Sequence, residues 1–368
     1  MKKMIPITKP FMPPAAEYQA YLNGIWEREW LTNNGPLVQE LEQKLKTYLG
    51  LEQLLFVGNG TVALQFAIRA LELSGEIITT PFSYIATTSS IVWEDCKPVF
   101  VDIDPATLNI DPALIEASLT SETTAILATH VFGNPCDIDA IMKVAKRYNL
   151  KVIFDAAHCF GSEYRGKSVY RYGDISTASF HATKVFQTVE GGAVITKDPK
   201  LHKAMDFMRN FGHDGPENYS GVGINGKNSE LHAAMGLCNL VYADRVLASR
   251  KKQTLYYDEL LNELDARRPD LLPDAKRNHS YYPLIFDHES IVIEIQKALK
   301  KNEIFTRRYF YPSLTQLDYI APQSSPVCSE LAARILCLPI YYDLREQDQE
   351  RIASILLHRQ KLHTLNVR

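Results

Sequence analysis

Residues 152–196 read VIFDAAHCFGSEYRGKSVYRYGDISTASFHATKVFQTVEGGAVIT, and this stretch decides the fold. The apolar run 152–154 ends on Asp155, and a second apolar run, 193–196, follows a Glu-Gly-Gly turn. Short apolar runs bounded by turn residues are typical of buried strands. Lys184 lies between these two runs and follows another apolar run. Because open α/β sheets bind ligands at the carboxyl ends of their strands, we expect Asp155 and Lys184 to face one ligand site.

Working outward, apolar runs alternate with helical patterns over the first 250 residues. Further strands are predicted at 54–57, 76–80, 98–103 and 125–131, and helices at 16–30, 38–49, 62–73, 137–149 and 201–211. This alternation favours an α/β fold with a mostly parallel sheet covered by helices on both faces. A continuous helical pattern at 230–264 leads to a smaller part with strands at 281–286 and 337–341 and helices at 290–301 and 347–358. We therefore predict a large domain, residues 1–250 including an N-terminal arm, and a smaller C-terminal α+β domain, residues 251–368.

Composition and charge exclude several classes of protein. The 368 residues carry a formal charge of −3, whereas a protein held on nucleic acid by phosphate contacts normally has a basic surplus. We find no apolar segment long enough to cross a membrane or to form a signal peptide core. The six cysteines show no C-x-x-C spacing, so neither a metal site nor a disulfide framework is indicated. They are expected to be buried thiols of a cytoplasmic protein.

One carboxylate and one lysine at neighbouring strand ends suit a cofactor with a cationic ring nitrogen and an aldehyde, and pyridoxal phosphate (PLP) has both. Such an enzyme needs a lysine that binds the aldehyde and then moves protons, and a carboxylate that keeps the ring nitrogen protonated. Lys184 and Asp155 can fill these roles. The glycine turn at Gly60 and Thr61, which opens a helix, can bind the phosphate together with Ser179.

Each of these residues also has an ordinary structural interpretation. A lysine after a strand is usually solvated, and an aspartate at a strand end is often a helix cap or a turn former. The glycine turn can be a plain connection between strand and helix, and Tyr84, which could stack on the cofactor ring, can be a core residue. Their joint occurrence is what favours the PLP site.

The motifs together resemble the sugar-nucleotide aminotransferases of the DegT family, which have the aspartate-aminotransferase-like type I PLP fold. The resemblance covers nearly the whole chain. It rests on NGTVAL at 59–64, PVFVDID at 98–104, DAAH at 155–158, GD at 173–174, SFHATK at 179–184 and EGG at 190–192, which occur in the family's order and spacing. The resemblance implies a large domain with a mostly parallel seven-stranded sheet.

The resemblance also implies roles for individual residues. Lys184 would form the Schiff base, Asp155 would bind the pyridine nitrogen, and His158 would lie near the phenolic oxygen of the cofactor. Further cofactor contacts are implied for Ala157 beneath the ring, Tyr84 above it, and Gly60, Thr61 and Ser179 at the phosphate. Asn225 would reach the phosphate from a neighbouring subunit, so that a homodimer would share its active sites.

The substrate implied by the resemblance is a nucleotide-linked keto-sugar, with L-glutamate as the amino donor. The loop WLTNNGP at 30–36 is similar to that of members that aminate carbon 4 of the sugar. SFHATKVF at 179–186 and RRYFYP at 307–312 are similar to members that make dTDP-4-amino-4,6-dideoxyglucose, a precursor in O-antigen and lipopolysaccharide synthesis, which indicates dTDP-4-keto-6-deoxyglucose as the substrate. Substrate contacts are expected from Thr32, Asn33, Lys227, Tyr309 and Tyr311.

Three alternatives stay open at this point. The chain could aminate carbon 3 instead, or it could be a non-catalytic regulatory protein on the same fold. A branch that removes the carbon 3 hydroxyl typically carries histidine in place of the lysine, and Lys184 argues against that chemistry. A regulator need not retain the lysine, the aspartate and the phosphate donors together, and this chain retains all three.

Overall fold

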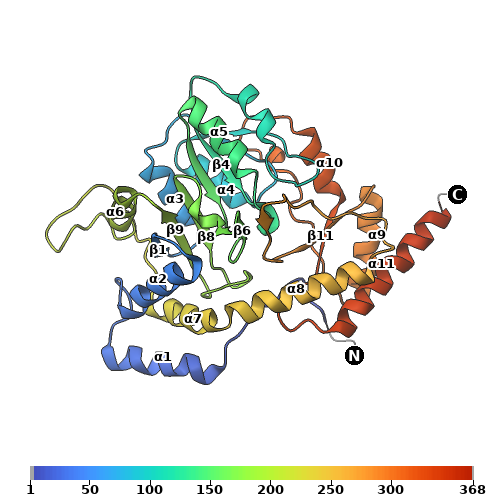
Figure 1. Cartoon of the computed structure of the whole chain (residues 1–368), viewed down its shortest axis with the longest axis horizontal. Helices are drawn as coiled ribbons and strands as arrows, with labels where there is room; N and C mark the ends of the chain where they lie inside the picture. Colours follow the sequence, from blue (N-terminus) through green and yellow to red (C-terminus); the bar gives the residue numbers. More distant parts are fainter. Residues whose placement is uncertain (1–3, 367–368) are drawn as a thin grey trace.

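A central seven-stranded sheet organises the computed structural model, which describes residues 4–366 (Figure 1). In order across the sheet, its strands are β1 (Gln53–Val57), β9 (Gly192–Thr196), β8 (Ile175–Ser179), β5 (Lys151–Asp155), β4 (Thr123–Thr129), β2 (Glu76–Thr79) and β3 (Lys97–Phe100). β9 runs antiparallel to both of its neighbours, whereas the pairs from β8 to β3 are parallel. The predicted α/β fold with a mostly parallel sheet is confirmed.

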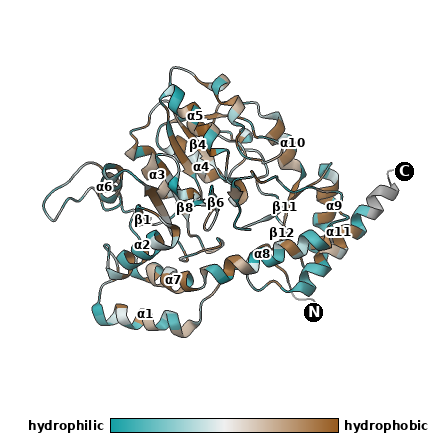
Figure 2. Cartoon of the chain, viewed as in Figure 1, coloured by the Kyte–Doolittle hydropathy of each residue, from teal (hydrophilic) through white to brown (hydrophobic). Residues whose placement is uncertain are grey.

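Helices cover both faces of the sheet, which explains why its strands are buried at nearly every position. Along β5, Val152 and Phe154 point into one core cluster and Ile153 into the other, as the two-residue period of a strand requires. The first cluster contains residues of α2 (Pro36–Leu49), α5 (Ile138–Tyr148) and α7 (Glu230–Val241). The second contains residues of α3 (Gly60–Ala70), α4 (Ile85–Trp93) and α6 (Pro199–Met208). Figure 2 shows the hydrophobic colouring of the central strands.

A smaller lobe follows the long helix α8 (Ala243–Leu260), which runs from beneath the sheet toward the C-terminal helices (Figure 1). Its elements are β11 (Tyr282–Ile285), α9 (Glu289–Lys301), α10 (Pro326–Arg334), β12 (Ile335–Leu338) and α11 (Glu346–Asn366). β11 and β12 form an antiparallel pair. A core cluster separate from those of the large sheet joins β11, α9, β12 and α11 with Tyr257 and Leu261. Residue 250, at which the sequence places the domain boundary, lies within α8, and the division itself stays a prediction.

Three features differ from the expectations. The helical pattern at 230–264 is two helices, because the backbone at Tyr242 (φ −102°, ψ 2°) leaves helical values between α7 and α8. Helix α10 was not predicted, although Pro326 at its first turn is a common helix start. A small sheet of β10 (Ala275–Lys276), β6 (Glu163–Tyr164) and β7 (Lys167–Ser168) was also missed, because two-residue strands carry no periodic signal.

The remaining parts agree with their sequence patterns. Helix α1 (Ala15–Arg28) follows a proline-rich arm, and Ile5 of this arm pairs with Ile304 of the smaller lobe. All six cysteines are buried and free, as expected. Within residues 4–366, no helix is long and apolar enough to cross a membrane.

Candidate active site

The carboxyl ends of β1, β8, β5, β4 and β2 meet at one edge of the sheet, and β9 begins there. The segments that follow these strands therefore gather at one place, as in other open α/β sheets. A pocket of about 450 Å³ lies at this edge. Its lining includes most of the predicted cofactor residues, namely Gly60, Thr61, Tyr84, Asp155, Ala157, His158, Ser179 and Lys184.

The turn between β1 and α3 forms the anion-binding end of the pocket. Asn59 caps α3 by accepting a hydrogen bond from the Val62 amide (2.9 Å). Within the described chain, the amides of Gly60 and Thr61 make no hydrogen bond, so these free donors and the helix dipole attract an anion. A Cβ at Gly192 would lie 2.5 Å from the Asn59 carbonyl carbon, so only glycine lets β9 begin this close to the turn.

Asp155, the last residue of β5, lies at the other end of the pocket. Its Oδ1 accepts a hydrogen bond from the Ala157 amide (3.1 Å), and its Oδ2 accepts one from the Thr87 hydroxyl (2.7 Å). Burial raises the pKa of the Asp155 carboxyl above its usual value, although these two hydrogen bonds and the positive charge of Lys184 act in the opposite direction. The site thus holds a buried carboxylate between two donors and a nearby cation.

Lys184 lies in the loop between β8 and β9, where its amide donates to the His181 carbonyl (2.9 Å). Burial lowers the pKa of its side-chain amine to about 8, against the opposing effect of Asp155. No carboxylate forms an ion pair with this amine among residues 4–366. With this pKa, roughly a tenth of the amine is neutral at pH 7, and the neutral form is the one that attacks a carbonyl carbon.

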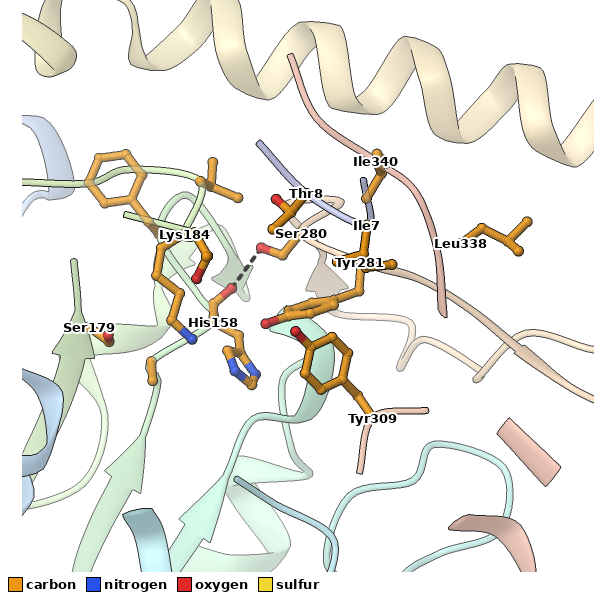
Figure 3. A pocket seen from close by; sticks show the side chains of 14 residues that line it. Ile7, Thr8, His158, Ser179, Lys184, Ser280, Tyr281, Tyr309, Leu338 and Ile340 are labelled. Atoms are coloured by element: carbon orange, nitrogen blue, oxygen red, sulfur yellow. Dashed lines mark hydrogen bonds between the residues drawn. The ribbon is translucent and has the colours of Figure 1, made fainter. Parts of the chain in front are cut away.

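His158 is packed between the two lobes. Its ring lies parallel to that of Phe310, with centroids 5.8 Å apart, and edge-on to that of Tyr281, at 5.0 Å. Its carbonyl accepts hydrogen bonds from Asn278 (2.7 Å) and the Ser280 hydroxyl (2.9 Å). Burial, reinforced by Lys184, holds the pKa of His158 well below its usual value, so the imidazole is neutral. Figure 3 shows His158 and Lys184 in the adjoining enclosed pocket, with Tyr281 and Tyr309 alongside.

Comparison with known proteins identifies the chain. Residues 14–357 match the model of the DegT/DnrJ/EryC1/StrS aminotransferase family. The chain belongs to this family. The family consists of PLP-dependent sugar aminotransferases, so the expected enzyme class and cofactor are confirmed.

Members of the DegT/DnrJ/EryC1/StrS family resemble the chain over its whole length. The dTDP-4-amino-4,6-dideoxy-D-glucose transaminase of Shigella dysenteriae is 43% identical over 365 residues, which are 97% of this chain and 99% of the relative. The transaminase of the same name from Escherichia coli is 38% identical, covering 96% and 98%. The crystal structure of DesI in the presence of its TDP-sugar product has a TM-score of 0.94 and 32% identity, covering 100% of this chain and 96% of that one.

The polar groups that line the pocket suit the chemical groups of PLP. Free amides at the start of α3 and the Ser179 hydroxyl suit a phosphate, and the carboxylate of Asp155 suits a protonated ring nitrogen. The half-buried Lys184, whose amine has a pKa lowered to about 8, suits an aldehyde. Tyr84 lines the pocket although 56% of its surface is exposed, so its ring is available for stacking.

Five residues that the sequence predicts to contact substrate or cofactor lie outside this pocket in the described protomer. Tyr309 lines it, whereas Thr32, Asn33, Asn225, Lys227 and Tyr311 do not. Asn225 and Lys227 interact with each other, since the Lys227 amine donates to the Asn225 side-chain oxygen (2.8 Å). The roles of Asn225 and Lys227 stay predictions.

Sequence reasoning missed several polar residues of the site. Ser83, Thr87, Tyr281 and Arg307 all line the pocket. The sequence offered a signal for Arg307, which begins the RRYFYP motif at 307–312, and for Tyr281, which begins a predicted strand. Nothing in the sequence distinguishes Thr87 from the other hydroxyl residues of its helix.

The loop 30–36, predicted to contact substrate, is held in place by hydrogen bonds to Glu230, whose side chain is fully buried. Its carboxylate accepts hydrogen bonds from the amides of Leu37 (3.0 Å) and Val38 (2.9 Å) at the start of α2, and its own amide donates to the Leu31 carbonyl (2.9 Å). A Cβ at Gly35 would lie 2.6 Å from the Glu230 carboxyl carbon. One buried side chain thus caps α2 and shapes the loop.

Glu230→Ala is expected to lower the free energy of unfolding by about 2 kcal/mol, because it leaves two buried amides without acceptors. Urea denaturation of the purified protein would measure the change. Glu40→Ala on the same helix is the control, since Glu40 forms only a surface ion pair with Lys44 and should cost less than about 0.5 kcal/mol. Equal losses in both variants would show that Glu230 does not act as a cap.

Proposed function

We propose that the chain transfers the amino group of L-glutamate to carbon 4 of dTDP-4-keto-6-deoxyglucose, giving dTDP-4-amino-4,6-dideoxyglucose. The observation that carries the proposal is the similarity, over nearly the whole chain, to two dTDP-4-amino-4,6-dideoxy-D-glucose transaminases, which are 43% and 38% identical to it. The loop WLTNNGP at 30–36, which is similar to that of family members that aminate carbon 4, supports carbon 4 over carbon 3. The product would serve O-antigen and lipopolysaccharide synthesis, from an enzyme located in the cytoplasm.

The residues of the pocket suit the two proton transfers that amino transfer requires. When bound, PLP supplies an electron sink that stabilises negative charge on the carbon carrying the amino group. Lys184 would anchor the cofactor and then carry a proton to and from that carbon, for which an amine of pKa about 8 is well matched to neutral pH. Asp155 would hold the ring nitrogen protonated.

His158 and the phosphate donors would keep the cofactor in place during these transfers. The neutral imidazole of His158, held between Phe310 and Tyr281, can donate or accept a hydrogen bond at the phenolic oxygen. Ala157 would pack beneath the ring and Tyr84 above it. Gly60, Thr61 and Ser179 would bind the phosphate.

We also propose that the active enzyme is a homodimer with shared active sites. Residues 212–228 form a loop that projects beyond α6 in Figure 1. Asn225 and Lys227 lie near the end of this loop, on either side of Gly226, whose carbonyl accepts a hydrogen bond from the Gly58 amide (2.8 Å). Apolar side chains of this region are exposed in the protomer, among them Phe211 (48%), Tyr219 (70%) and Val222 (90%). Exposed apolar clusters of this kind are typical of subunit interfaces. A neighbouring subunit would bring Asn225 to the phosphate and Lys227 to the substrate.

A comparison of keto-sugars tests the proposed substrate. The purified protein with PLP and L-glutamate should convert dTDP-4-keto-6-deoxyglucose and release 2-oxoglutarate in equal amounts. The corresponding 3-keto-sugar should react at least about tenfold more slowly in kcat/KM, because its carbonyl carbon is displaced from the proton donor. NMR of the product would locate the new amino group.

Two other results would replace the proposal. Faster conversion of the 3-keto-sugar would identify a carbon 3 aminotransferase. A protein that takes up no PLP and converts neither sugar would favour the regulatory alternative.

A further inference from the structure

Three buried hydroxyls form a continuous chain behind Asp155. The Thr87 hydroxyl donates to Asp155 Oδ2 (2.7 Å), Ser83 Oγ lies 2.7 Å from Thr87 Oγ1, and Thr129 Oγ1 lies 3.1 Å from Ser83 Oγ. All three side chains are buried, with at most 2% of their surface exposed. They come from three segments, since Thr129 ends β4, Thr87 lies on α4, and Ser83 precedes that helix.

The chain has a direction that depends on the charge of Asp155. If Asp155 is ionised, the Thr87 hydroxyl uses its single hydrogen to donate to the carboxylate. The Ser83 hydroxyl must then donate to Thr87, and the Thr129 hydroxyl must donate to Ser83. If Asp155 were protonated at Oδ2, every donor would reverse and Thr129 would need an acceptor. No second partner of the Thr129 hydroxyl exists among the described residues. The hydroxyl chain therefore favours the ionised carboxylate.

The adjacent residue shows that this arrangement is specific to Thr87. Thr88 and Ser90 are buried hydroxyl residues of the same helix, and their hydroxyls have no hydrogen-bond partner in the part of the chain that the structure describes. Only Thr87 aims its hydroxyl at the carboxylate. Hydrogen bonds in a low-dielectric interior strengthen one another along such a chain.

We propose that Thr87, supported by Ser83 and Thr129, is a positioning residue that keeps Asp155 ionised and turned toward the pyridine nitrogen of the cofactor. The proposal rests on the proposed role of Asp155 and adds the residues through which that role is maintained. The Ala157 amide fixes one carboxylate oxygen and Thr87 the other, so that the carboxylate cannot rotate.

The binding of PLP to the apoenzyme tests this proposal without reference to turnover. Thr87→Val keeps the shape of the side chain and removes the hydrogen-bond donor. It should raise the dissociation constant for PLP by about tenfold or more, since hydrogen bonds to a charged group are among the stronger ones. Thr88→Val is the matched control and should change it by less than about twofold, because it removes a hydroxyl without a partner. Thr87→Ser should restore most of the affinity.

The pH dependence of binding supplies a second measurement. Loss of the Thr87 donor removes an interaction that lowers the pKa of Asp155, so that pKa rises. On acidification, Thr87→Val should therefore lose PLP affinity at a higher pH than the wild type. In an Asp155→Asn background, Thr87→Val should have little further effect, because the charge on which it acts is gone. Ser83→Ala, which leaves Thr87 in place, should give a smaller loss and serves if Thr87→Val does not fold.

The possible failures are distinguishable. Wild-type protein that binds no PLP would overturn the proposed function itself. Normal PLP binding by the wild type, with equal affinities for Thr87→Val and Thr88→Val or with the same loss in the Asp155→Asn background, would overturn the role of the hydroxyl chain alone.

Discussion

Lys184→Ala should reduce the rate of amino transfer by about 10⁴-fold or more, because one side chain supplies both the nucleophile that anchors the cofactor and the acid–base group. The initial rate of 2-oxoglutarate formation measures the loss. The visible absorption band of PLP bound through the lysine should also be absent from the variant. The position of Lys184 in the pocket and its pKa of about 8 are the structural basis of this expectation.

A second lysine provides the control. Lys197 also follows a strand, β9, but it is exposed and lies away from the pocket. Lys197→Ala should retain the absorption band and a rate within about twofold of the wild type, as most surface substitutions do. Retention of the band by Lys184→Ala would show that another amine anchors the cofactor and would contradict the assignment.

The sheet and the centre of the site were predictable from the sequence because their physical requirements are local. A strand buried on both faces is a short apolar run, and β5 and β9 show this plainly. Parallel strands bring their carboxyl ends together, so Asp155 and the segment with Lys184 could be placed at one edge from the order of the elements alone. Structure adds that β5 and β8 are direct neighbours.

The remainder depended on contacts between distant segments. Thr87 and Ser83 lie before β4 in the chain, whereas Asp155 lies after it. Their contact with Asp155 depends on the order of strands in the sheet, in which β4 lies between β2 and β5. Glu230 is an ordinary acidic residue in the sequence, and its capping of α2 spans 193 residues. No local pattern contains such information.

The proposed sharing of active sites between subunits can be tested by mixing two defective variants. Asn225→Asp places a carboxylate beside the expected phosphate and should inactivate the site by like-charge repulsion. Lys184→Ala inactivates the site in its own subunit. In a heterodimer of the two variants with shared sites, one site combines both defects and the other has neither, so the heterodimer should recover about half of the wild-type activity.

The heterodimer can be isolated by co-expression of the two variants with different affinity tags and sequential purification on both. If each site is built within one protomer, the heterodimer contains one site that lacks Lys184 and one site that carries the Asn225→Asp substitution, and it stays inactive. The two arrangements therefore give opposite results. Activity of the heterodimer would place Asn225 across the interface, and it would explain why this residue and Lys227 lie outside the pocket of the isolated protomer.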